Sequence, residues 1–69
     1  MTQKDLAYVE DAIGHESNII KIIQESIKNI QDEKLVTFLE TELSGHTKTK
    51  EQLINKLEEK LYEWSTTNG

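Results

Sequence analysis

The 69-residue chain has no cysteine, no proline and no arginine, and it has only three glycines. Without cysteine the chain forms no disulfide bond and no thiolate metal site. Without arginine it lacks the side chain best suited to grip a phosphate or carboxylate with two hydrogen bonds. Because so few prolines and glycines interrupt the chain, long helices are favoured over strands and loops.

The charge balance and the hydropathy pattern exclude several classes of partner. Thirteen acidic residues against eight lysines give a net charge of −5, which is unsuited to binding the phosphates of nucleic acid. No apolar run approaches the roughly 18–20 residues of a membrane span. The acidic N-terminal stretch does not resemble a secretory signal. We therefore expect a cytoplasmic protein without a nucleic-acid or membrane partner. No catalytic constellation stands out, so we predict that it is not an enzyme.

The first half of the chain has apolar residues at alternating steps of three and four. This stripe runs from Leu6 to Ile30, with the spacing typical of the seam between packed helices. Thr2, followed three residues later by Asp5, is typical of a helix-starting capping box. The pattern predicts a helix over about residues 3–30.

A second stripe with the same spacing runs from Val36 to Leu57. Asp32 precedes it as a suitable N-cap residue. The pattern predicts a second helix over about residues 33–64, and the polar residues 65–69 are expected to form a frayed tail.

A short break near residue 31 would make the two helices antiparallel neighbours in a single all-α domain over residues 1–69. One continuous helical rod is the alternative, but the apolar stripe loses register between Ile30 and Val36. Four isoleucines cover an arc wider than one neighbouring helix can hide: Ile19, Ile20, Ile22 and Ile23. We therefore expect the hairpin to dimerise into a four-helix bundle, although a different protein partner would cover the same surface.

Three polar residues interrupt the stripes, namely Glu16 in the first helix and His46 and Lys50 in the second, and Glu42 lies at a stripe edge. Glu16 precedes the break by about as many residues as His46 follows it, so these side chains are expected at one level of the hairpin. Such a layer fixes register when Glu16 pairs with His46 or Lys50.

The alternative is a metal site formed by Glu16, Glu42 and His46. In a two-fold dimer, two copies of each residue would supply four carboxylates and two imidazoles, which is the ligand set of di-iron and di-manganese bundles. This alternative predicts iron or manganese as cofactor, whereas the structural polar layer predicts no cofactor.

The segment DEKLVTFL (32–39), together with Glu16 and His46, resembles the spore coat F-type proteins and their ferritin-like relatives. The resemblance implies half of a ferritin-like bundle, a dimetal carboxylate site and a role in sporulation. The glutamate of the family's Glu-x-x-His pattern falls at Leu43, and this chain has Glu42 instead.

A glycine precedes each histidine, at Gly14 and Gly45. Because a glycine inside a helix costs roughly 1 kcal/mol relative to alanine, we expect both to allow a close approach between the helices. His15 lies off the stripe and is expected to be exposed. Together the patterns predict a small self-associating protein with a structural or protein-interaction role, the dimetal protein being the alternative.

Overall fold

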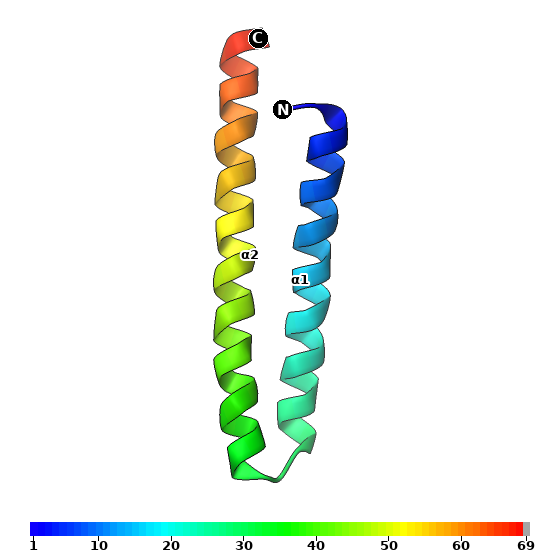
Figure 1. Ribbon diagram of the computed structural model, residues 1–69, viewed down its shortest axis with the longest axis vertical. Coiled ribbons are helices and arrows are strands. Elements are labelled where there is room, and N and C mark those ends of the chain that lie inside the picture. The colour runs from blue at the N-terminus through cyan, green and yellow to red at the C-terminus, as the bar shows by residue number, and fades with distance from the viewer. Residues whose placement is uncertain (69) are drawn as a thin grey trace.

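The computed structural model describes residues 1–68, with side chains as far as Thr66, and this part of the chain forms two α-helices. α1 spans Gln3–Asn29 and α2 spans Glu33–Asn68. The helices lie side by side and antiparallel in a hairpin that measures 53 × 16 × 12 Å (Figure 1). The predicted all-α hairpin is confirmed, and the continuous rod is wrong.

α1 begins with the predicted capping box. The Asp5 N–H donates to Thr2 Oγ1 at 3.0 Å, and the Thr2 N–H donates to Asp5 Oδ2 at 3.2 Å. These bonds satisfy backbone donors that have no partner within the first turn of a helix. At the other end, the Ile30 N–H still donates to the Ser26 carbonyl at 3.0 Å, but the Ile30 backbone is extended (φ −92°, ψ 132°), so α1 ends one residue before its predicted end.

α2 follows after a turn of three residues, Ile30 to Asp32. The Asp32 carboxylate accepts hydrogen bonds from the N–H groups of Lys34 and Leu35, at 2.9 and 3.1 Å. Asp32 is therefore the N-cap, as predicted. Its negative charge also lies at the positive end of the α2 dipole.

The polar tail predicted over residues 65–69 is wrong for residues 65–68, because α2 continues to Asn68. No proline or glycine stops the helix before Gly69, which lies outside the described residues. The Thr66 hydroxyl donates to the Glu63 carbonyl at 2.9 Å. A side-chain bond of this kind is compatible with a helical backbone, so polarity alone was not a stop signal.

The apolar stripes of both helices face each other, but the hairpin buries little of them. Ile23, with 8% of its surface exposed, is the one buried residue among those described. Most other seam residues are half-buried. Eight large apolar side chains are exposed: Met1, Tyr8, Ile22, Leu35, Phe38, Leu61, Tyr62 and Trp64.

The two mid-helix glycines do not serve the close approach that the sequence predicted. A Cβ atom built on Gly14 or Gly45 meets nothing within 4 Å. Each has space for a methyl group, so contact between α1 and α2 is not the reason for glycine at either position.

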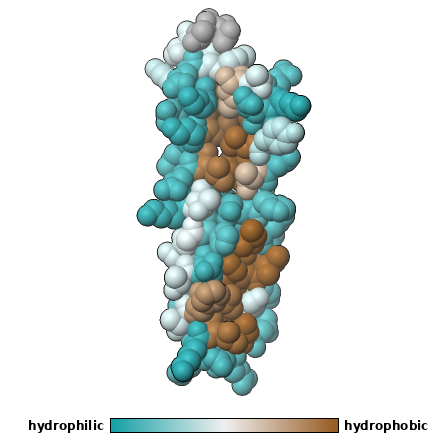
Figure 2. Space-filling view, in the orientation of Figure 1, coloured by the Kyte–Doolittle hydropathy of each residue, from teal (hydrophilic) through white to brown (hydrophobic). Residues whose placement is uncertain are grey.

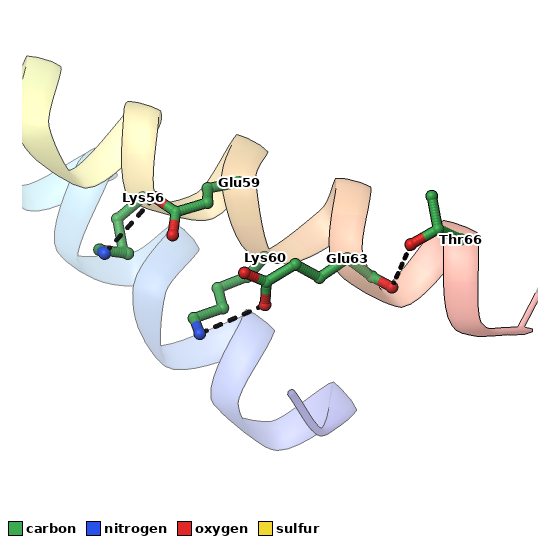
Figure 3. Close-up of polar contacts among 5 residues, drawn as sticks. All are labelled: Lys56, Glu59, Lys60, Glu63 and Thr66. Carbon is green, nitrogen blue, oxygen red and sulfur yellow. Dashed lines mark hydrogen bonds and ion pairs between the residues drawn. The ribbon is translucent and has the colours of Figure 1, made fainter.

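The last third of α2 carries two ion pairs between residues three apart (Figure 3). Lys56 Nζ lies 3.4 Å from Glu59 Oε2, and Lys60 Nζ lies 3.4 Å from Glu63 Oε2. All four side chains are exposed, so each pair contributes only a few tenths of a kcal/mol, roughly.

Candidate functional site at mid-hairpin

Glu16 of α1 and His46 of α2 meet midway along the hairpin. The distance from Glu16 Oε2 to His46 Nδ1 is 2.6 Å, across a separation of 30 residues in sequence. This contact joins a side chain of α1 directly to a side chain of α2. Counting from the turn placed these residues at one level, and the structure brings them into direct contact.

Glu42 lies one helical turn before His46 and faces the other ring nitrogen. Its Oε2 is 3.8 Å from His46 Nε2, which is too long for a hydrogen bond and suits an ion pair when the ring is protonated. The imidazole therefore stands between two carboxylates. We call these three residues, Glu16, Glu42 and His46, the polar layer.

The polar layer is partly sheltered from water, and its three side chains differ in exposure. Glu16 is 18% exposed, His46 30% and Glu42 45%. Glu16 gains the most from a partner, because a sheltered carboxylate without a hydrogen bond is costly. Glu42 is still well solvated, so its attraction to the ring is weak.

Lys50 is half-buried one turn beyond His46. Between residues 1 and 66 no ion pair joins Lys50 to Glu16, and His46 takes the position beside that carboxylate. Of the two pairings that the sequence allowed for Glu16, the structure therefore contains the histidine pairing. His15 is exposed, as predicted.

The contact with Glu16 fixes the orientation of the His46 ring. When Nδ1 carries the proton it donates to Glu16, which leaves Nε2 with a lone pair directed towards Glu42. A carboxylate that orients a histidine in this way also occurs behind metal-bound and catalytic histidines. Here the arrangement joins the two helices at a defined height, which is what a register-setting contact requires.

The polar layer of one hairpin does not supply a complete metal site. Among the described residues, no group of three or more histidine, aspartate or glutamate side chains is placed to hold an ion. Glu16 occupies Nδ1, so one chain would offer only His46 Nε2 and Glu42 to a metal. The dimetal site stays a prediction, and it requires further ligands from a second copy.

The sequence analysis missed a second feature, an apolar hollow at the open end of the hairpin. It is partly open to solvent, has a volume of about 330 Å³ and is lined mainly by Met1, Leu6, Leu61 and Trp64. In the sequence, the helical spacing of Leu57, Leu61 and Trp64 was the pattern that could have indicated this apolar hollow. The open end is thus apolar but loosely filled.

Comparison with protein-family models, curated proteins and solved structures finds no match for this chain. The resemblance to spore coat F-type proteins therefore stays a prediction that depends on a helical pattern and a few polar positions. Neither helix, over the described residues, contains a stretch both long and apolar enough to cross a membrane.

Proposed function

We propose that this chain is a small self-associating protein, in which two hairpins pack into a four-helix bundle with a structural or protein-interaction role. The observation that carries the proposal is the poor coverage of the apolar residues. Between residues 1 and 66 one residue, Ile23, is buried, while Ile22 and Phe38 are 65% and 59% exposed. Exposed side chains of this size, grouped together, mark surfaces that bind another protein.

The solvent-accessible surface area of the hairpin also favours self-association. The hairpin exposes 5598 Å², whereas a globular protein of its mass, 8.0 kDa, exposes about 4,500 Å². Two hairpins would have to bury about 3,800 Å² in total to reach the surface expected for one globular dimer. That area lies within the range of roughly 2,000–5,000 Å² typical of obligate dimers.

The mass of the protein in solution tests the proposal. Light scattering coupled to size-exclusion chromatography at micromolar concentration should give twice the monomer mass of 8.0 kDa. Circular dichroism on the same sample should show the helix content of the hairpin. A folded monomer would overturn the proposal, because it would show that the hairpin is stable with its apolar residues exposed.

Within the bundle, the role of the polar layer is to fix the register of α1 against α2. Replacing Glu16 alone by leucine should lower the free energy of unfolding by about 1 kcal/mol, because His46 loses its hydrogen-bond partner. His46→Leu should cost a similar amount. The double variant should recover most of both losses, because two leucines pack against each other without an unpaired polar group.

Urea denaturation of the four proteins, followed at 222 nm, measures this coupling. A coupling energy of about 1–2 kcal/mol between Glu16 and His46 is the expected result. Strictly additive losses would contradict a register-setting contact.

The alternative is a dimetal carboxylate protein that binds iron or manganese at a two-fold site. The arrangement that favours it is His46 Nε2, which faces Glu42 while Glu16 orients the ring. Elemental analysis of the purified dimer separates the two functions. Two metal ions per dimer, lost in the variant Glu42→Gln, would establish the alternative, and a dimer that ignores added Fe²⁺ and Mn²⁺ would exclude it.

A further inference from the structure

The two faces of the hairpin that flank the seam differ near the turn. Each seam residue has one neighbour just before it in sequence and one just after it. The two antiparallel helices are related by an approximate two-fold axis perpendicular to the plane that contains both of them. The residues that directly precede seam residues therefore lie on the same face of the hairpin in both helices. Following neighbours share the opposite face.

Near the turn, two preceding neighbours on each helix are large and apolar, whereas Ser26, Asn29 and Glu42 on the same face are polar. Ile19 and Ile22 precede the seam residues Ile20 and Ile23 in α1, and Leu35 and Phe38 precede Val36 and Leu39 in α2. Three of the four neighbours, Ile22, Leu35 and Phe38, are exposed. We call these four side chains (Ile19, Ile22, Leu35 and Phe38) the turn-half face.

The opposite face at the same height has no such surface. The residues that follow the seam residues there are all polar: Lys21, Gln24, Lys28, Thr37, Glu40 and Ser44. An apolar surface thus covers one face of the turn half and is absent from the other. Only the first face is suited to packing against another helical pair.

The character of the first face changes along its length. Figure 2 shows apolar surface spreading over both helices towards the turn, and narrowing to a strip between hydrophilic side chains towards the open end. In the open half, the preceding neighbours include the charged residues Asp5, Lys56 and Glu63 together with Tyr8 and Ala12, and Glu59 lies beside Lys56. Lys56 and Glu59 form an ion pair there (Figure 3).

We propose that a second copy of this chain docks on the turn-half face, with the turns of both hairpins at the same end of the bundle. This rests on the proposed self-association and adds the face and the orientation. In this orientation the four apolar side chains of one copy meet the same four of the other. Turns at opposite ends would instead press Ile22 and Phe38 against Lys56, Glu59 and Glu63, and charged groups would be buried without new partners.

Two features of the described chain accord with a second copy as the occupant. The surface in excess of a globular protein is of the size that a dimer interface removes. The patch is also isologous, because it is self-complementary when two copies meet about an axis parallel to the helices. Glu42, at the border of this face, lies 3.8 Å from His46 Nε2 in each copy, so each Glu42 carboxylate has an ion-pair partner when the His46 ring is protonated.

The orientation is tested by a distance between the two turns. The chain has no cysteine, so Gln31→Cys carries a single spin label at an exposed position outside both helices. Neighbouring helices lie 8–10 Å apart, so turns at one end should give a distance of roughly 20–25 Å between labels. Turns at opposite ends should give a distance close to the 53 Å length of the hairpin.

A dimer with the short distance supports the proposal. A dimer with the long distance overturns it while self-association stands, and a folded monomer overturns both. This measurement leaves the apolar residues unchanged, so it stays decisive even if variants of the face unfold.

The face is tested by paired lysine substitutions at one height of the hairpin. Ile22→Lys with Phe38→Lys should raise the dissociation constant of the dimer by about 100-fold or more, because both large apolar anchors are replaced by charges. The control is Gln24→Lys with Thr37→Lys, which adds the same charges on the opposite face. Sedimentation equilibrium measures both. Equal weakening of the dimer by the two pairs, or none by the first, would overturn the turn-half face.

Discussion

The turn half and the open half of the hairpin contain similar numbers of apolar residues but cover them differently. The turn half holds Ile23, the buried residue, and is closed by a capped three-residue turn. The open half has a hollow beside Leu61 and Trp64, and exposed ion pairs along α2. The polar layer lies between the two halves. Stability is therefore expected to be concentrated near the turn, where packing is closest.

The geometry of a two-helix hairpin also explains why apolar side chains of this chain stay exposed. Two helices of this length meet along one seam, and each seam residue then touches only one other helix. Side chains beside the seam have a partner only if more helices join. The turn half has four such apolar side chains on one face, whereas several of those positions in the open half are charged, among them Asp5, Lys56 and Glu63. The division between the halves thus separates the surface proposed for assembly from the surface that faces water.

Ile23→Ala should have the largest effect on stability. Removing most of a buried isoleucine lowers the free energy of unfolding by about 2–4 kcal/mol, through lost burial and a residual cavity. Leu61→Ala, in the open half, should cost about 1 kcal/mol or less, because that side chain is already partly in water. Urea denaturation at equal protein concentration compares them. Equal losses would contradict a division between the halves.

Removal of the helix cap at each end of the hairpin should change the free energy of unfolding by amounts that differ less. Asp32→Ala removes an acceptor for two N–H groups at the closed end and should cost about 1 kcal/mol. Thr2→Ala removes one side of the capping box next to the chain terminus, and should cost only a few tenths of a kcal/mol, roughly. Thermal melting by circular dichroism ranks them. A greater loss for Thr2→Ala would place the stable end of the hairpin opposite the turn.

The smallest difference in stability is expected between the variants Gly14→Ala and Gly45→Ala. Both methyl groups enter open space, so each should raise helix stability by up to about 1 kcal/mol. Gly45 directly precedes the seam residue His46, so it lies on the face proposed for a second copy, and Gly14 lies on the opposite face. Gly14→Ala should therefore stabilise the dimer more, as measured by melting temperatures at two protein concentrations. A larger gain for Gly45→Ala would place Gly45 outside the interface.

Local chemistry in the sequence was sufficient to predict most of the fold. Asp5 and Asp32 mark the helix starts because their carboxylates bind specific backbone N–H groups nearby. The common level of Glu16 and His46 also followed from the sequence, because a short turn allows the height along each helix to be counted in residues. The end of α2 was mispredicted because polar residues such as Thr66 are compatible with a helix when nothing forces the backbone to turn.

Side-chain depth and pairing were less accessible to sequence reasoning. Helical periodicity gives the direction of a side chain, but the depth at which it is buried depends on how many neighbours arrive. Ile20 and Ile23 both lie on the predicted stripe, yet Ile20 is half-buried and Ile23 is buried. The choice between His46 and Lys50 as the partner of Glu16 likewise depends on interatomic distances, which spacing along a helix does not specify. The glycines were assigned to a close helix contact that the structure does not contain.

The three-residue turn has a consequence for the order in which the hairpin folds. Contacts beside the turn join residues that are close in sequence, and closing so short a loop costs little chain entropy. Contacts at the open end join residues nearly a full chain length apart, and they become accessible only after the intervening pairs have formed. We therefore expect contacts between the helices to form first beside Asp32 and then progressively towards the termini. This folding should be rapid, as it is for helical proteins with mainly local contacts. The turn-half face would then be complete before the open end closes, so two nascent chains could pair through it early in folding.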